Sequence, residues 1–201
     1  MQQRNILILF AHPALHKSRV NARMVEAVRE LEGVTFRDLY SEYPDFQIDV
    51  KKEQQYLLDH DLIIWHHPFY WYSAPAILKE WIDLVLEHGF AYGREGKALR
   101  GKEVLSVITT GGRRESYQTE GFNQYTINQF LAPFNRTVTL CNMTYLPPFV
   151  VHGSHLFKED EIDQAASDYR NTLTALRDSL FTPEEFKGYE YISDLLMMQK
   201  K

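Results

Sequence analysis

Residues 62–76 have the sequence Leu-Ile-Ile-Trp-His-His-Pro-Phe-Tyr-Trp-Tyr-Ser-Ala-Pro-Ala, an apolar run that ends in a proline and a cluster of aromatic residues. A short apolar run without polar alternation is typical of a strand that is covered on both faces, as in a parallel sheet. The aromatic loop after it would suit the floor of a site for a flat ligand. It would suit a hydrophobic core or an interface equally well, so the rest of the chain has to decide.

Five segments have strand-like patterns, and helical patterns separate them. Some of the strands are nearly continuous apolar runs, whereas residues 34–40 and 137–145 alternate as half-buried strands do. The alternation of strands and helices predicts a doubly wound α/β fold around a five-stranded parallel sheet. The predicted strands are 5–10, 34–40, 61–67, 103–110 and 137–145.

The predicted helices rest on apolar residues at helical spacing and on end signals. Gly33 closes the first helix, and Pro75 suits the first turn of the third, where its missing N–H costs nothing. Thr182 suits the N-cap of a final short helix or a frayed tail. We therefore expect one α/β domain over residues 1–181 and a helical or disordered tail over 182–201. The predicted helices are 20–31, 51–60, 75–85, 121–134 and 159–180.

Composition excludes several classes of function. A net charge of −5 without a basic block argues against nucleic-acid binding. The single cysteine, Cys141, excludes an intramolecular disulfide framework and is expected to be a small core residue. No apolar run reaches the roughly 18 to 20 residues that cross a bilayer. We expect a cytoplasmic protein, which could still dock on a membrane protein.

Ligands of doubly wound sheets bind beyond the carboxyl ends of the strands, and three predicted loops lie there, at 11–21, 68–73 and 109–117. In the first loop, His12, Ser18 and Asn21 accompany the free N–H groups of a helix start, a combination that favours a phosphate. The loop lacks the glycine pattern of dinucleotide sites and the Walker lysine. Ser18 and Asn21 could also simply cap the helix.

The third loop brings small residues after the fourth strand. Gly111 and Gly112 follow Thr109 and Thr110, and such residues let backbone amides approach a planar ring closely. An ordinary glycine turn is the alternative. Tyr117 could donate a proton to a carbonyl that is being reduced, although it could also be a packing residue.

Metal and hydrolytic sites are poorly supported. His12 and His16 lie on either side of a proline loop region, and the adjacent His66 and His67 should point in opposite directions. His152 and His155 have no evident carboxylate partner. No Ser-His-Asp or Cys-His arrangement stands out, so we predict no metal and no nucleophilic hydrolysis.

The three loops together resemble those of the flavodoxin-like NAD(P)H:quinone oxidoreductases, the DT-diaphorase family. The branch that contains the ancillary subunits of glutathione-gated potassium-efflux systems is most similar. The resemblance covers residues 5–180 and rests on three motifs in order: Ala-His-Pro with Ser18 and Asn21, residues 67–81, and Thr-Thr-Gly-Gly at 109–112. Branch-specific similarity lies in Leu39-Tyr40, 43–49, 88–93 and 146–149.

This resemblance implies a flavodoxin-like sheet with strand order 2-1-3-4-5 and a bound flavin, FMN or FAD. It also implies a ping-pong reaction. NADH or NADPH first reduces the flavin, and a quinone then binds in the same slot and takes two electrons. The residues that it implies for the phosphate are His12, Ser18, Arg19, Val20 and Asn21. Those that it implies for the ring are Pro68, Phe69, Tyr70, Trp71, Tyr72, Thr109, Thr110, Gly111 and Gly112.

The same resemblance assigns a proton relay and an assembly. Tyr117 occupies the position of the family's relay tyrosine, but Asn123 stands where better-known members carry a histidine. Asparagine can hydrogen-bond but cannot take up a proton near neutral pH, so the relay has to differ. The family site lies at a two-fold dimer interface, which implies that Tyr92 of a second copy joins Trp71, Tyr72 and Tyr117 around the substrate.

Three functional hypotheses follow. The first is a homodimeric, FMN-dependent NAD(P)H:quinone oxidoreductase. The second is a regulatory subunit of a membrane potassium-efflux antiporter, located at the inner face of the cell membrane through that partner, with redox activity secondary. An electron-transfer flavodoxin is the weakest, because such proteins use a Ser- and Thr-rich phosphate loop and a strongly acidic surface.

Overall fold

The strands of the sheet all run parallel, in the order β2-β1-β3-β4-β5, and a further strand, β6, also pairs with β4. The computed structural model describes residues 3–182, 184–186 and 188–198. The predicted strand order is confirmed. The strands are β1 Ile6–Phe10, β2 Val34–Asp38, β3 Leu62–Pro68, β4 Glu103–Thr109, β5 Thr144–Tyr145 and β6 Phe149–Val151.

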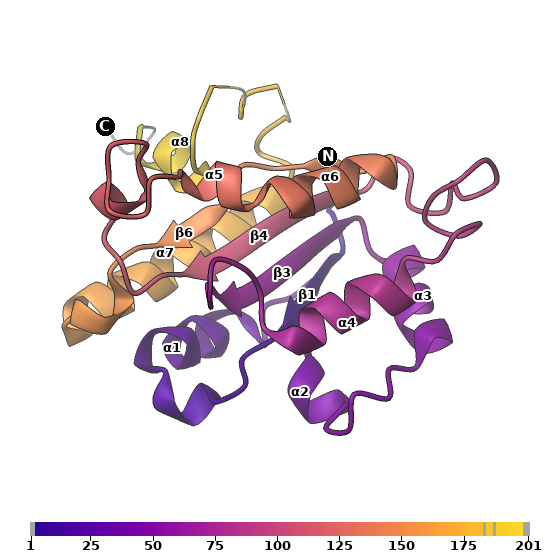
Figure 1. Ribbon diagram of the computed structural model, residues 1–201, viewed down its shortest axis with the longest axis horizontal. Helices are drawn as coiled ribbons and strands as arrows, with labels where there is room; N and C mark the ends of the chain where they lie inside the picture. Colours follow the sequence, from indigo (N-terminus) through magenta and orange to yellow (C-terminus); the bar gives the residue numbers. More distant parts are fainter. Residues whose placement is uncertain (1–2, 183, 187, 199–201) are drawn as a thin grey trace.

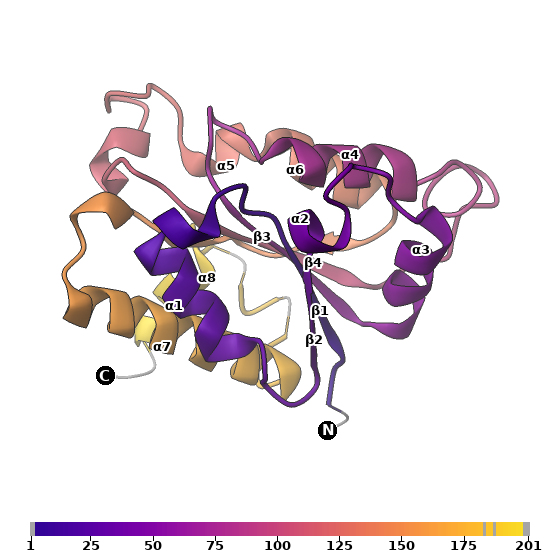
Figure 2. The same ribbon diagram turned by 90° about the horizontal axis from the view of Figure 1, so that it is seen from below.

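Helices cover both faces of this sheet (Figures 1 and 2). One face carries α1 (Arg19–Val28), α7 (Glu159–Arg177) and α8 (Ile192–Met198). The other face carries α2 (Leu39–Glu42), α3 (Val50–Asp59), α4 (Ala76–Val85), α5 (Ile127–Phe130) and α6 (Ala132–Leu140). Short 3-10 turns are η1 Leu15–Lys17, η2 Arg114–Tyr117 and η3 Ser154–Leu156.

Side-chain alternation along the central strands divides the core in two. Leu7 and Leu9 of β1 pack on the face of α4 and α6, whereas Ile6, Ile8 and Phe10 pack on the face of α1 and α7. Every residue of β1 and β3 is buried. This burial on both faces explains why the two strands have continuous apolar sequences.

The predicted fifth strand over 137–145 is wrong except for its last two residues, which form β5. Residues Ala132–Leu140 form α6, in which Phe134 and Val138 are buried, and Leu131 and Cys141 extend the same buried stripe. This spacing of three and four residues is helical, and it overrides the β-branched alternation of Thr137 to Thr139. The strand position next to β4 is filled by the short β5 and by β6, on either side of the prolines at 147 and 148.

The predicted helix over 121–134 is correct only in its second half, where α5 and the start of α6 lie. Its first part is irregular, with Gln124 at a positive φ of 61°, and a capping box between Thr126 and Gln129 starts the short helix α5. The remaining predicted helices correspond to α1, α3, α4 and α7 within a few residues at their ends.

The C-terminal segment packs against the sheet domain. Thr182 hydrogen-bonds Glu185 in a turn, but the last helix begins only at Ile192. Tyr191 and Ile192 are buried, and the Ile192 N–H donates to the Pro148 carbonyl at 3.1 Å. Among the described residues, none of the helices is long and apolar enough to cross a membrane.

Candidate functional site

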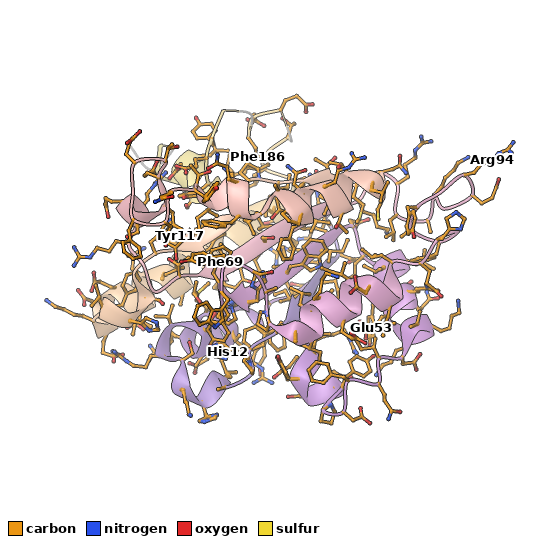
Figure 3. All side chains as sticks on the ribbon, in the orientation of Figure 1. His12, Glu53, Phe69, Arg94, Tyr117 and Phe186 are labelled. Carbon is orange, nitrogen blue, oxygen red and sulfur yellow. The ribbon has the colours of Figure 1, made fainter. Side chains whose placement is uncertain are left out.

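A cavity of about 310 Å³ lies beyond the carboxyl ends of β1, β3, β4 and β6. Figure 3 shows His12, Phe69 and Tyr117 at this end of the molecule and Arg94 at the opposite end. A parallel sheet brings the loops after its strands to one edge, so residues far apart in the chain line one space. The cavity has the size of a small-molecule site.

The first loop ends in the N-terminus of α1, and Ser18 is its N-cap. The Ser18 Oγ accepts the Asn21 N–H at 3.3 Å, while the N–H groups of Arg19 and Val20 have no acceptor among the described residues. These free donors and the helix dipole face the cavity, which Arg19 and Val20 line. The capping role and a phosphate-binding role of Ser18 are therefore compatible.

His12 is buried beside these donors. Because the Ala14 N–H donates to His12 Nδ1 at 3.1 Å, the proton of a neutral imidazole lies on Nε2. Burial lowers the pKa of His12 below its usual value, and Asp38 opposes this shift. The ring is thus neutral near pH 7 and can donate a hydrogen bond from Nε2 to an anion.

Asn21 links the first and third loops. Its Nδ2 donates to Ser18 Oγ and to Thr109 Oγ1, at 2.9 Å each. Because each hydroxyl accepts from Asn21, its own proton remains available, and neither hydroxyl donates to another group within the described chain. The cavity is therefore lined by donors that lack acceptors.

The aromatic loop after β3 makes a tight turn. Tyr70 and Ser73 pair across it, and the two central residues, Trp71 and Tyr72, have φ of 48° and 63°. Two successive positive φ angles are typical of a type I′ turn, which non-glycine residues form only at an energetic cost. Trp71 is 93% exposed, so no packing of its own side chain offsets that cost. Strain of this kind is often found at functional sites.

The third loop has glycine where side chains would collide. A Cβ on Gly111 would lie 2.8 Å from the His155 ring, and one on Gly112 would lie 3.1 Å from the ring of Tyr117. The N–H groups of both glycines have no acceptor among the described residues. These glycines therefore allow close packing and leave amides at the cavity edge.

Tyr117 lies behind this loop and is buried. Its hydroxyl interacts with the Thr110 side chain and the Gly112 backbone, and burial raises the pKa of the phenol. His152 Nδ1 lies 3.3 Å from Thr110 Oγ1, and the His152 and Tyr117 ring centroids are 5.6 Å apart. Asn123 lies beside the same region without lining the cavity, since its Oδ1 accepts the Tyr72 hydroxyl at 3.2 Å and its N–H donates to the Ser116 carbonyl at 2.9 Å.

The structure thus brings most of the expected residues together. Tyr92 does not join them in its own chain, because its loop precedes β4 and lies at the opposite end of the sheet from the cavity (Figure 1). Trp71, Tyr72, Thr110, Gly112 and Tyr117 lie next to the cavity without lining it. The expected residues that line it are His12, Ser18, Arg19, Val20, Asn21, Pro68, Phe69, Tyr70, Thr109 and Gly111.

Four lining residues were missed by sequence reasoning: Ala14, Lys17, Ser154 and His155. Lys17 could have been inferred, because a cation beside a predicted phosphate site is favourable. Ser154 and His155 belong to η3, after β6. They could not be found once the fifth strand was assigned to 137–145, because that assignment moved its carboxyl end away from them. No group of three or more potential metal ligands occurs in the described part of the chain.

Comparison with known proteins identifies similar sequences and folds. A family model described as a flavodoxin-like fold matches residues 4–173. The glutathione-regulated potassium-efflux system ancillary protein KefG of Serratia proteamaculans is 44% identical over 172 residues, which are 86% of this chain and 94% of that protein.

Two solved structures have the same arrangement. General stress protein 14 of Treponema denticola, in complex with FMN, has a TM-score of 0.81 and 37% identity and covers 86% of this chain and 99% of its own. An NADPH-quinone reductase from P. pentosaceus has a TM-score of 0.75 and 34% identity and covers 85% of this chain and 96% of its own.

Proposed function

Because this chain belongs to the flavodoxin-like NAD(P)H quinone reductase family, we propose that it is an FMN-dependent oxidoreductase that reduces quinones with NADH or NADPH. One observation carries the proposal: the donors without acceptors at the start of α1 line one cavity together with Tyr70, which begins the strained aromatic turn, and Gly111 of the glycine loop. This combination suits a flat ring that carries a phosphate.

The residues at the start of α1 fit the phosphate. The Arg19 and Val20 amides, the Ser18 and Thr109 hydroxyls and His12 Nε2 are donors in one place, and Lys17 adds a cation. The guanidinium of Arg19 pairs with Glu159, so its backbone N–H is the group that we assign to the phosphate. FMN needs only this single phosphate site, and we therefore prefer it to FAD.

The other two loops fit the ring. Phe69 N–H donates to the Thr109 carbonyl at 2.9 Å, which joins the second and third loops into one wall. The N–H groups of Trp71 and Tyr72, like those of the two glycines, have no acceptor in the described residues. We assign these amides to the polar edge of the ring, where negative charge gathers on reduction.

When bound, the flavin would supply hydride and two-electron transfer between NAD(P)H and a quinone, which bind in turn in a ping-pong sequence. The chain itself would shape the shared slot with Trp71 and Tyr72. Tyr72 stacks on Phe130 with ring centroids 4.8 Å apart, and this contact holds it beside the cavity. Tyr117 would donate a hydrogen bond or a proton through its hydroxyl, next to Thr110.

A homodimer completes this proposal. The exposed Trp71 and Phe122 lie on loops at the carboxyl end of the sheet, with exposed fractions of 93% and 89%. Exposed large aromatic residues are common at interfaces. The partner copy would cover them and contribute its Tyr92 to the pocket.

Steady-state kinetics test the activity directly. Protein reconstituted with FMN is expected to oxidise about one NADH or NADPH per flavin without a quinone, and to sustain turnover when a benzoquinone or naphthoquinone is present to reoxidise the flavin. Absence of turnover with every pair of donor and quinone would refute the enzymatic proposal. Tyr72→Ala is expected to impair quinone turnover more than FMN retention, and the reverse outcome would mean that the turn holds the ring.

A second candidate function rests on the similarity to KefG. We propose that the chain also acts as an ancillary subunit of a potassium-efflux antiporter, in the cytoplasm at the inner face of the membrane. Co-purification with such an antiporter and slower potassium efflux after deletion of the gene would support this role. Normal efflux after deletion and no co-purification would remove it.

A further inference from the structure

His66 is a buried histidine on β3 that none of the roles above uses. Its ring is fully buried between Phe10 and Tyr169, with ring centroids 4.9 and 5.1 Å away in edge-on contacts. Its Nε2 lies 3.2 Å from Asn21 Oδ1, whereas its Nδ1 has no hydrogen-bond partner among the described residues. A single polar contact therefore connects His66 to the cavity, and it passes through Asn21.

The direction of this contact determines the protonation of His66. An amide oxygen can only accept, so Nε2 has to be the nitrogen that carries the proton, and Nδ1 is left as a bare lone pair. Burial lowers the pKa of His66 to about 3, so the ring is neutral at pH 7 and has one N–H. The unpartnered Nδ1 is consistent with this tautomer.

The tautomer has a consequence for the cavity. Because the Asn21 oxygen accepts from His66, the Asn21 NH2 group points to the hydroxyls of Ser18 and Thr109. Each hydroxyl accepts a hydrogen bond from this NH2 group at 2.9 Å and keeps its own proton. If the proton were on Nδ1, the amide would be turned round, and its oxygen would take the protons of both hydroxyls. The cavity would then lose two donors that point toward an anion.

We propose that His66 is a positioning residue for the phosphate site: its Nε2–H holds the Asn21 amide so that the Ser18 and Thr109 hydroxyls donate to the phosphate of the flavin. This inference rests on the proposed function, because it concerns the same phosphate. It adds a buried residue that does not line the cavity and that acts only through Asn21.

His67 is a matched control within the same strand. It is as buried as His66, but it faces the other side of the sheet, where its ring stacks on Phe134 with centroids 6.0 Å apart. Its Nδ1 lies 2.9 Å from the Pro68 carbonyl, and it has no contact with Asn21. A substitution at 67 thus disturbs the core to a similar degree without touching the phosphate site.

The experiment measures the binding of FMN and of riboflavin, which lacks the phosphate, to the full-length apo-protein by quenching of flavin fluorescence. For His66→Leu, we expect about a tenfold or greater loss of FMN affinity and a change of less than about twofold for riboflavin. His66→Gln should restore most FMN binding, because its amide can donate near the position of Nε2. His67→Leu should bind both flavins like the wild type.

Each outcome decides the inference. Wild-type FMN affinity in His66→Leu, or an equal loss of FMN and riboflavin, would overturn the positioning role. A wild-type protein that binds neither flavin would overturn the proposed function, and this inference with it. Long-range ¹H–¹⁵N NMR of the histidines gives a second test, in which a proton on Nδ1 of His66 would also contradict it.

Discussion

Two polar clusters of the molecule differ in whether the groups at their centre find all their hydrogen-bond partners within the fold. In the first, Glu53 is fully buried and accepts from Arg37, Tyr43 and Trp81 at 2.7, 2.6 and 2.8 Å. In the second, Ser18 and Thr109 accept from Asn21 but keep protons that no described residue accepts. In the first cluster, which we call closed, the Glu53 carboxylate is satisfied within the fold, and Arg37 Nε, which has no partner among the described residues, lies outside the cavity lining. In the second, which we call open, the unmatched protons lie at the cavity and can bind a ligand.

Replacement of Glu53 should have the largest effect on folding. Glu53→Ala leaves the Arg37 guanidinium buried without its main partner, and we expect the free energy of unfolding to fall by about 3 to 5 kcal/mol. Urea denaturation measures this. Glu42→Ala removes the other carboxylate near Arg37. The Glu42 side chain is 36% exposed, so this variant should lose less than about 1 kcal/mol of unfolding free energy. Similar losses in both variants would mean that the first cluster is not a closed structural unit.

Acid should destabilise the protein through its buried histidines. Burial lowers the pKa of His66 to about 3 and that of His67 to about 4, whereas both titrate near 6.5 in the unfolded chain. The unfolded state therefore binds more protons below pH 6.5, and stability falls as the pH drops from 6.5 toward 4.

Each histidine should contribute about 1.4 kcal/mol per pH unit in this window. Urea denaturation at several pH values measures the slope, and His67→Gln should reduce it by one histidine's share. An unchanged slope in that variant would show that His67 does not stay neutral in the fold.

Substitutions in the open cluster should weaken ligand binding more than they destabilise the fold. Ser18→Gly removes a hydroxyl from the phosphate site but retains an acceptable N-cap residue, so we expect about a tenfold loss of FMN affinity with a stability loss of only a few tenths of a kcal/mol. Ser18→Ala should lose FMN affinity similarly and about 1 kcal/mol of stability. If affinity followed stability in the two variants, Ser18 would be a capping residue only.

The smallest expected effect is a gain in stability. Trp71→Gly relieves the positive φ at a position that is exposed in the single chain, and we expect the free energy of unfolding of the monomer to rise by about 0.5 to 1 kcal/mol after the entropic cost of glycine. Quinone turnover should fall in the same variant. Phe122→Gly is the control, because Phe122 is similarly exposed but has no positive φ. Equal changes in both would exclude strain at Trp71 as the cause.

The apolar runs predicted the central strands and their parallel sheet, because these strands are buried on both faces, whereas the strand order was predicted from the family resemblance. The sequence also predicted that His66 and His67 diverge, since neighbouring side chains of a strand alternate. It failed over 137–143, where β-branched alternation and helical spacing coexist and the packing of α6 against the sheet decides.

The parts of the site that lie on loops directly after correctly predicted strands could be predicted. The first three loops were found from the apolar runs that precede them, but the fourth, with Ser154 and His155, was lost with the misplaced fifth strand. The neighbours of Tyr117 could not be predicted either, because Thr110, His152 and the C-terminal segment meet there only in three dimensions.

The central claim is that the open cluster holds the phosphate of a flavin. The most direct measurement is the visible absorption spectrum of the purified protein, followed by identification of the flavin that denaturation releases. We predict flavin absorption bands and about one FMN per chain, either as purified or after reconstitution. A colourless protein that cannot be reconstituted with FMN would contradict the claim.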